Sequence, residues 1–492
     1  MTLKRRIPMN TLKIHFQRLI AAATACMLSA ALLHLTPNAM ESHALLLGDC
    51  SGDGVLNAAD AKLLAAHLTQ QYRIKQTAAE AADCNSDGVV DGEDLTLLKR
   101  MLLYPAPKEE TVTLMVYMCG SDLETEAYQA TTDIYEILDA SLKENFHVTI
   151  ATGGAKQWHE DNEYVDHTSN YYMHYSKDGV ESVPVSGGRR NMASAETLSD
   201  FITASVAAYP ADRYALVLWD HGGGPIYGLC YDEIFDETMF VDILCTALDT
   251  ANVHFDWIGF DACLMGTAEV AYAMRSYADY MIASQELESG LGWSYTEFIE
   301  DWSENPSIST EELAETIMVA TVVKNILYQM DSTLALYDLS YADAVMQALY
   351  AYGNDLYQMY RAGNLSKIMK ARSQALDFGK GEYDLVDLVD FVQALPTANS
   401  PALLAAMEQM VISKYNYRLD DASGLSMWFF ENYPDEAYYL DYTMKQYGIN
   451  SQYLKQLSEM ANAYEKSSFL LSEPSLQDDA IIIAFHQMMG RP

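Results

Sequence analysis

Basic residues are scarce in this chain. Its 492 residues include 30 Lys and Arg but 69 Asp and Glu, and the formal net charge at pH 7 is −39. So acidic a surface repels a phosphate backbone, and nucleic acid is therefore excluded as a partner. It attracts cations and basic polypeptides, although solubility alone also explains such a charge.

Cysteine is scarce as well, with seven residues in the whole chain. So few cysteines in so long a chain do not form a disulfide framework, and none of them has the close spacing of a zinc site. Half of the residues are hydrophobic, which is enough apolar surface for the cores of about three domains. Each cysteine therefore needs an explanation of its own.

One long apolar run, "LIAAATACMLSAALLHL", lies near the N-terminus, and Ser42-His43-Ala44 follows it with small residues at the positions of a cleavage site. The basic residues ahead of or at the start of this run are Lys4, Arg5, Arg6, Lys13 and Arg18. The pattern predicts a secretory signal peptide over residues 1–44, cut after Ala44, and a secreted protein with no membrane attachment once this peptide is removed. Because the run is long, an uncleaved anchor is the alternative.

Two acidic segments repeat, "DCSGDGVLNAAD" from Asp49 and "DCNSDGVVDGED" from Asp83. Their spacing is that of a calcium-binding loop, in which oxygens at positions 1, 3, 5, 7, 9 and 12 surround one point and a glycine at position 6 allows the sharp turn. The first loop offers Asp49, Ser51, Asp53, the Val55 carbonyl, Asn57 and Asp60. The second offers Asp83, Asn85, Asp87, the Val89 carbonyl, Asp91 and Asp94. The repeat predicts two calcium ions.

The repeat departs from an ordinary EF-hand. Each loop is followed by a helical stretch, "AKLLAAHLTQQY" or "LTLLKRMLL", but none precedes it, and position 12 is Asp rather than Glu. Residues 48–103 resemble a type I dockerin, the module that docks enzymes onto cohesins of a bacterial scaffold protein. The resemblance implies a cohesin partner and a scaffold-bound, cellulosome-type location at the bacterial cell surface.

Two pairs of residues bear on how this module works. In the dockerin family, loop positions 10 and 11 help to choose the cohesin; here they are Ala58-Ala59 and Gly92-Glu93, so the two halves are not equivalent. Cys50 and Cys84 occupy the same position in each loop. A disulfide between them is one outcome that the sequence permits, but the sequence does not fix the distance.

The remaining chain is divided by composition. "YPAPKEE", residues 104–110, has the prolines and mixed charge of a short linker. We expect a dockerin over 45–103, a main domain over 111–445, and a C-terminal helical segment and tail over 446–492.

The main domain alternates apolar runs with amphipathic stretches. Strands are expected at 111–118, 146–152, 214–220, 255–262 and 280–284, helices at 123–143, 194–208, 238–251 and 266–276, and a hairpin near 163–183. Continuous apolar strands between helices predict an α/β fold with a mostly parallel sheet covered on both faces. The ligand site of such a sheet lies beyond the carboxyl ends of its strands. Beyond about 341 the chain reads as mainly helical, including 383–395, with one further strand within 424–430.

Two of these strands end in candidate catalytic residues. "ALVLWDHGGG" delivers His221, and "WIGFDAC" delivers Cys263 42 residues later, so both are expected at the same sheet edge. A cysteine attacks as the thiolate, and an imidazole beside it favours that form and later protonates the leaving amine. The Gly222 N–H is placed to stabilise an oxyanion. A His that precedes the Cys by about 40 to 50 residues, with the Cys in a D-A-C-x-x-G pattern, is the arrangement of caspase-like proteases.

Each of these residues also has a structural interpretation. An apolar-flanked cysteine is often simply buried, and a histidine before glycine is weak evidence alone. Cys119, in "YMCGSDLE", is the rival thiol, but it has no adjacent histidine and is expected to pack at a strand end. Cys230 and Cys245 are interpreted as semi-buried structural residues.

Several blocks in order resemble the clostripain family of cysteine peptidases. They run from about residue 114 to 430 and are "LMVYMCGSDLETE", "TGGAKQW", "ETLSDFI", "RYALVLWDHGGG", "LCYDE", "IGFDACLMGTAEVAYAM", "YMIASQELESGLGW" and "GLSMWFF". The resemblance implies a caspase-like α/β fold in which Cys263 is the nucleophile and His221 its partner. Asp261 matches the family's acid at the floor of the S1 pocket, which implies cleavage of polypeptides after Arg or Lys.

Asp261 has an alternative role, because a carboxylate there also suits the capping of a nearby loop. A second acid, Glu286 or Glu288, is a candidate to share the pocket.

The chain departs from the family in a feature that concerns processing. Members of this family often cut themselves after a basic residue between His and Cys, but no Lys or Arg occurs between Arg213 and Arg275. We therefore expect a single chain, or a cut elsewhere; two chains with a new terminus between His221 and Cys263 would refute this.

Two functions follow as hypotheses. The first is a secreted, scaffold-docked cysteine endopeptidase for basic P1 residues. The alternative is a catalytically silent caspase-like module that serves assembly on the scaffold. Intact His221, Cys263 and Asp261 favour the enzyme.

Overall fold

The computed structural model describes residues 47–53, 56–75, 78–85, 87–103, 110–440 and 442–469. Contacts divide the chain into two units, residues 1–108 and 109–492. The predicted signal peptide, most of the predicted linker and Val55 lie outside the described residues. Within the described ranges, no helix is both long and apolar enough to cross a membrane.

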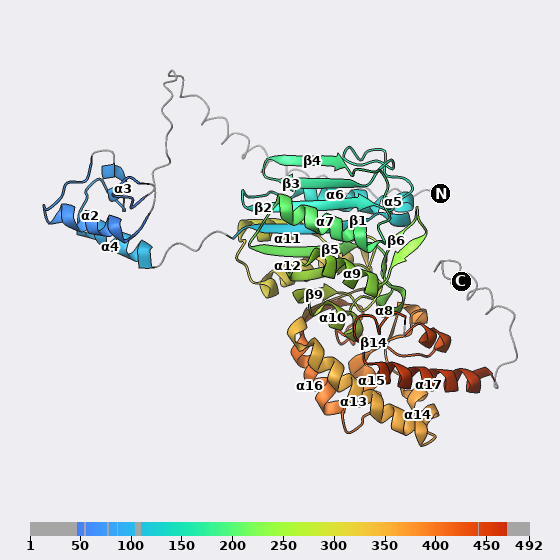
Figure 1. The fold of residues 1–492 in the computed structure, drawn as a ribbon. Coiled ribbons are helices and arrows are strands. Elements are labelled where there is room, and N and C mark those ends of the chain that lie inside the picture. Colours follow the sequence, from blue (N-terminus) through green and yellow to red (C-terminus); the bar gives the residue numbers. More distant parts are fainter. Residues whose placement is uncertain are drawn as a thin grey trace, which may run out of the picture. The chain divides into compact units, whose positions relative to one another are not determined.

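The N-terminal unit is a small helical domain. Its helices are α2 (Ala58–Leu68), α3 (Ala79–Ala82) and α4 (Gly92–Leu103). Helices α2 and α4 pack against each other, with Leu64 and Leu98 fully buried between them (Figure 1). Cys50 and Cys84 lie in the same core as free thiols, and burial raises the pKa of Cys50 to about 12 and that of Cys84 to about 11. Both thiols are therefore protonated at neutral pH.

The second unit is built on a nine-stranded sheet with the order β13-β10-β9-β8-β5-β1-β2-β3-β4. Its central strands are β9 (Ala278–Ala283), β8 (Phe255–Asp261), β5 (Arg213–Trp219), β1 (Val112–Cys119) and β2 (Phe146–Gly153), and they are parallel. Antiparallel strands extend both edges, β3 (Tyr171–Ser176) and β4 (Gly179–Pro184) at one and β10 (Ser332–Asp338) and β13 (Val411–Tyr417) at the other. The predicted α/β fold with a mostly parallel sheet is confirmed (Figure 1).

Helices cover both faces of this sheet. One face carries α7 (Ala195–Ala208), α9 (Val241–Ala251) and α10 (Ala268–Met274); the other carries α6 (Gln129–Asp139), α11 (Tyr295–Glu304) and α12 (Thr310–Tyr328). All eight residues of β1 are buried, because alternate side chains enter the two cores. Met115 and Tyr117 join the first core, whereas Leu114 and Val116 join the second.

The elements differ from the expected ones in several places. The expected helix at 123–143 is divided into α5 (Ser121–Ala127) and α6, because Tyr128 adopts a left-handed conformation with φ of 60°. The hairpin begins at Tyr171 rather than near 163. A short α8 (Gly224–Tyr227) and a second hairpin, β6 (Leu229–Asp232) and β7 (Glu237–Met239), were not predicted.

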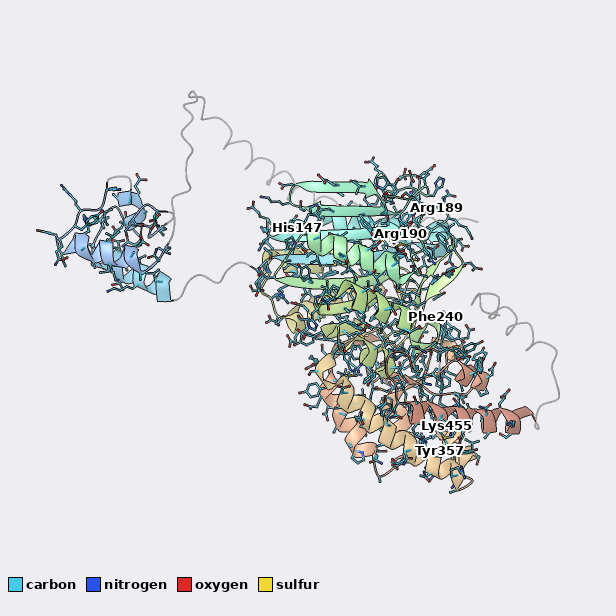
Figure 2. All side chains as sticks on the ribbon, in the orientation of Figure 1. His147, Arg189, Arg190, Phe240, Tyr357 and Lys455 are labelled. Atoms are coloured by element: carbon cyan, nitrogen blue, oxygen red, sulfur yellow. The ribbon has the colours of Figure 1, made fainter. Side chains whose placement is uncertain are left out.

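The C-terminal part is mainly helical, as predicted. It contains α13 (Ala342–Arg361), α14 (Leu365–Arg372), α15 (Leu388–Ala394), α16 (Ser400–Met410) and α17 (Ser451–Phe469), with 3₁₀ turns at Leu339–Tyr341, Gly379–Gly381 and Pro434–Tyr438. Helices α13 and α17 pack against each other; Tyr357 and Lys455 are labelled on them in Figure 2, and the Tyr357 hydroxyl of α13 donates to Glu459 Oε2 of α17 at 2.5 Å.

A second, three-stranded sheet lies within this region. It consists of β11 (Asp377–Phe378), β12 (Leu385–Asp387) and β14 (Ser426–Trp428). The expected helix at 383–395 thus starts with a strand, and the strand expected within 424–430 belongs to this sheet. The Ser426 N–H donates to Gly266 O at 3.0 Å, and the Trp428 N–H donates to Glu269 Oε1 at 3.1 Å. The small sheet therefore supports the loop that follows Cys263.

Candidate active site

Two neighbouring strands bring His221 and Cys263 together. Trp219 of β5 pairs with Asp261 of β8 in parallel register, and each candidate residue follows its strand by two positions. Both line one cavity of about 410 Å³, together with Gly222, Tyr227 and other residues of the loops around it. The predicted juxtaposition at the carboxyl edge of the sheet is therefore present.

Gly222 is needed for this close approach. A Cβ at this position would lie 2.1 Å from the carbonyl oxygen of Cys263 and 3.0 Å from its backbone nitrogen. Within residues 110–440, neither the Gly222 N–H nor the Cys263 N–H has a hydrogen-bond acceptor. Two backbone N–H donors are therefore free beside the cavity. The Gly222 donor was predicted from the sequence, and the Cys263 donor was not.

The Cys263 thiol is held by the backbone of Glu288. Its Sγ accepts a hydrogen bond from the Glu288 N–H at 3.1 Å and lies 3.9 Å from the Glu288 carbonyl oxygen. Burial, followed by the adjacent Glu288 carboxyl, raises the pKa of Cys263 to about 12. In the part of the chain that the structure describes, no hydrogen bond joins this sulfur to His221. The free protein therefore holds Cys263 as a neutral thiol.

His221 is oriented by a residue that the sequence analysis did not identify. Its Nε2 donates to Asp122 Oδ1 at 2.9 Å, because an ionised carboxylate only accepts. Asp122 lies at the start of α5, and the hydroxyl of the preceding Ser121 donates to Asp220 Oδ1 at 2.5 Å. With Nε2 protonated, Nδ1 is left as the basic nitrogen of the ring.

Asp261 lies beneath the site rather than in the cavity wall. Its side chain is 5% exposed, and its Oδ2 accepts hydrogen bonds from the Trp293 N–H at 3.1 Å and the Tyr295 hydroxyl at 2.9 Å. Asp261 is absent from the lining of the cavity that contains His221 and Cys263. In the free protein Asp261 therefore makes the contacts expected of a carboxylate that holds a nearby loop, which was the alternative interpretation. Its role in the S1 pocket stays a prediction.

Asp261 belongs to a cluster of carboxyl groups. Glu288 lies against it and accepts from the Trp293 indole N–H at 3.2 Å, while Asp133 on α6 accepts from the Trp219 indole N–H at 2.7 Å. Burial is the largest cause that raises the pKa of Asp133, Asp261 and Glu288. For Asp133 and Glu288 the second-largest cause is the charge of Asp261.

Of the two acids considered for this pocket, only Glu288 faces Asp261. Glu286 instead accepts the backbone N–H groups of Leu287 at 2.7 Å and Gly379 at 2.9 Å. Lys324 on α12 is the cation of this region, with its Nζ 2.7 Å from Glu136 and 4.0 Å from Asp133. The cluster thus carries more acid than base, which suits a cationic ligand.

Comparison with known proteins agrees with this geometry. The sequence profile of the clostripain family matches residues 116–472. The chain belongs to the clostripain family. Residues 47–103 match the dockerin type I domain.

Individual relatives of this clostripain-family chain cover it to different extents. The clostripain of Hathewaya histolytica is 29% identical over 38% of this chain and 41% of its own length, so the match spans less than half of that relative. A secreted C11 cysteine protease of Bacteroides thetaiotaomicron, in complex with an irreversible peptide inhibitor, is 19% identical with a TM-score of 0.54, covering 69% of this chain and 98% of that one. An inactive zymogen C11 protease of Parabacteroides distasonis is 21% identical with a TM-score of 0.53, covering 72% and 99%. These two structures share the fold.

The other cysteines of the clostripain domain are structural in their surroundings. Cys119, Cys230 and Cys245 are buried, and burial raises the pKa of each thiol. The Cys119 thiol donates to the carbonyl of Tyr231 at 3.3 Å, and none of the three lines the cavity.

The predicted calcium ligands of the two dockerin loops lie among the described residues, apart from Val55, and their role as ligands stays a prediction. Position 12 has the same arrangement in both loops: Asp60 accepts from the Ser51 N–H at 3.0 Å and the Asn57 N–H at 2.9 Å, and Asp94 accepts from the Asn85 N–H at 3.3 Å and the Asp91 N–H at 2.7 Å. Carboxylate, amide and hydroxyl oxygens are the ligands that calcium prefers. Among the described residues, no group of three or more acidic, His or Cys side chains is gathered closely enough to hold an ion.

Proposed function

We propose that this protein is a secreted cysteine endopeptidase that hydrolyses polypeptides after Arg or Lys by a Cys263–His221 dyad, and that its dockerin attaches it to a cohesin-bearing scaffold at the bacterial cell surface. The observation that carries the proposal is the shared cavity, in which Cys263, His221 and the free N–H of Gly222 meet at two neighbouring strand ends.

The proposed reaction uses groups already at this edge. His221 Nδ1 takes the proton of the Cys263 thiol, and Sγ attacks the scissile carbonyl carbon. The resulting oxyanion is stabilised by the Gly222 and Cys263 N–H groups. The imidazolium then protonates the leaving amine as the C–N bond breaks, which leaves a thioester. Water, deprotonated by His221, hydrolyses the thioester and returns the thiol.

Specificity is assigned to the Asp261 cluster. A guanidinium or ammonium group that reaches partly desolvated carboxylates gains charge-assisted hydrogen bonds, whereas a neutral side chain leaves those carboxylates unpaired. The excess of carboxyl groups at Asp133, Asp261 and Glu288 supports a basic P1 residue.

A thiol-reactive arginyl ketone tests the proposal against a silent assembly module. One observation favours the silent alternative, namely the neutral Cys263 thiol without a hydrogen bond to His221 in the described residues. The proposed enzyme forms a covalent adduct with the arginyl ketone at Cys263, located by mass spectrometry, and reacts much more slowly with a matched leucyl ketone. A chain that leaves both ketones unreacted would support the assembly module.

Asp122 is expected to act as a positioning residue for His221. Replacement by Asn keeps the shape but offers the Nε2–H a weaker, neutral acceptor and permits the wrong ring tautomer. We expect kcat to fall by about 10- to 100-fold with KM nearly unchanged, a smaller loss than for an enclosed acid because the pair is half exposed. Glu126→Gln, an exposed acid on the same helix, is the control and should leave kcat at the wild-type value. An unchanged kcat in Asp122→Asn would contradict this role.

The dockerin is expected to bind two calcium ions, which would organise both loops for the cohesin. Residues at positions 10 and 11, Ala58-Ala59 and Gly92-Glu93, are exposed at the starts of α2 and α4 and are proposed to contact the cohesin. Calorimetric titration of the calcium-free full chain should give two ions per chain, and Asp94→Ala should give one, because it removes the position-12 ligand of the second loop. Glu93→Gln, the adjacent exposed acid outside the ligand set, should still give two; equal stoichiometry in all three proteins would refute the assignment.

A further inference from the structure

Glu288 touches both the nucleophile and the acid cluster. Its backbone N–H and carbonyl hold Cys263 Sγ, at 3.1 Å and 3.9 Å. Its side chain lies against Asp261 and accepts from the Trp293 indole. The loop after Cys263 is tied to the same segment, because the Leu264 N–H donates to the Glu286 carbonyl at 3.2 Å. A movement of residues 286–290 would therefore change the backbone contacts of the Cys263 thiol.

The path to Asp261 is closed in the free protein. Cys263 and Leu287 line the cavity, whereas Asp261 does not. Glu288 follows Leu287, and its carboxyl lies against the Asp261 carboxyl. A P1 side chain that enters from the cavity and pairs with Asp261 must therefore displace or share the Glu288 carboxyl.

The Glu288 carboxyl lies against Asp261, where a cationic side chain would pair. Glu288 Oε2 accepts from Trp293, but Oε1 is buried and receives no hydrogen bond from the described residues. Burial and the adjacent Asp261 raise the pKa of Glu288 well above its usual range, which favours a proton shared between the two carboxyl groups. Asp133 from α6 adds a third buried carboxyl, whose pKa is raised by burial and by the Asp261 charge and lowered by Lys324 from α12.

We propose that Glu288 couples the S1 pocket to the nucleophile, so that a basic P1 side chain pairing with Asp261 and Glu288 releases the Cys263 thiol from the Glu288 backbone. This inference rests on the proposed function of the same site. A guanidinium between the two carboxylates replaces the shared proton, which leaves to solvent. The Glu288 side chain then turns toward the ligand, residues 286–290 shift, and the freed thiol gives its proton to His221.

Alkylation of Cys263 by iodoacetamide, a small neutral reagent, tests this coupling without a scissile bond. The probe ligand is n-butylguanidinium, which fills a basic P1 site but carries no carbonyl, and n-butylurea is its neutral match. The working concentration of n-butylguanidinium is set by its competition with hydrolysis of an Arg peptide. We expect it to accelerate alkylation of Cys263 by about tenfold or more, the gain in thiolate when a thiol pKa falls by at least one unit. Butylurea should give no acceleration.

Variants then identify the residue responsible. Glu288→Gln should lose the acceleration, because its amide cannot ionise, while Glu382→Gln, an exposed acid in the loop before the cavity residue Tyr383, should keep it. The wild-type comparison needs no variant and so does not depend on the folding of Glu288→Gln. An unchanged wild-type alkylation rate at saturating butylguanidinium would overturn the coupling even if Arg peptides are cleaved. Loss of basic specificity itself would instead overturn the proposed function.

Discussion

Replacing Cys263 with alanine is expected to abolish peptide hydrolysis and leave the fold intact. The substitution removes the sulfur that is proposed to attack the carbonyl, and no other thiol lines the cavity within the described residues. The rate should fall by about 10⁴-fold or more, the size of loss seen when a covalent nucleophile is removed. The structural cost is one sulfur contact with the Glu288 N–H, about 1 kcal/mol of unfolding free energy.

Hydrolysis of an Arg peptide, together with the thermal midpoint, measures both effects. Cys245→Ala is the matched control, because Cys245 lies on α9, is buried and is outside the cavity. It should retain full turnover per folded molecule. Residual turnover of Cys263→Ala at the wild-type rate would exclude Cys263 as the nucleophile.

Replacing Asp261 with asparagine is expected to remove the preference for basic residues. Asn keeps an acceptor for the Trp293 N–H and the Tyr295 hydroxyl, so the fold of the loop is retained. It leaves a bound guanidinium without its buried counter-charge, a loss of about 3–4 kcal/mol, which corresponds to about 10²- to 10³-fold in kcat/KM for Arg and Lys peptides. Slow cleavage of a neutral peptide should be unaffected.

The ratio of kcat/KM for Arg and Leu peptides measures this effect. Asp279→Asn is the control, since Asp279 lies on the neighbouring strand β9, is exposed and pairs with His254. Its ratio should equal that of the wild type. If Asp261→Asn cleaves Arg peptides as well as the wild type does, Asp261 acts only as the loop-holding residue that its contacts with Trp293 and Tyr295 describe.

The sequence was sufficient for the parts of the site that depend on local patterns. His221 and Cys263 each follow a continuous apolar strand, and parallel strands end at one edge, so their meeting was predictable. The position of Gly222 was predictable for the same reason. The sheet's parallel centre followed from the alternation of apolar runs and amphipathic stretches.

Residues that act across long separations carried no such signal. Asp122 contacts His221 although the two residues are 99 positions apart in the sequence. The contact depends on where α5 begins. That start is determined by the left-handed conformation of Ser121 and by its hydrogen bond to Asp220. Asp133 joins the cluster from α6, a helix that begins after the break at Tyr128, and the sequence predicted no such break. The hold of Glu288 on the thiol uses backbone atoms, which no sequence pattern specifies.

The central claim is that Cys263 cleaves polypeptides after basic residues. Hydrolysis of four fluorogenic peptides that differ only in P1, with Arg, Lys, Asp or Leu, by the wild type and by Cys263→Ala tests it most directly. We predict cleavage after Arg and Lys by the wild type alone. Cleavage after Asp or Leu at comparable rates, no cleavage of any peptide by the wild type, or hydrolysis that survives in Cys263→Ala would contradict the claim.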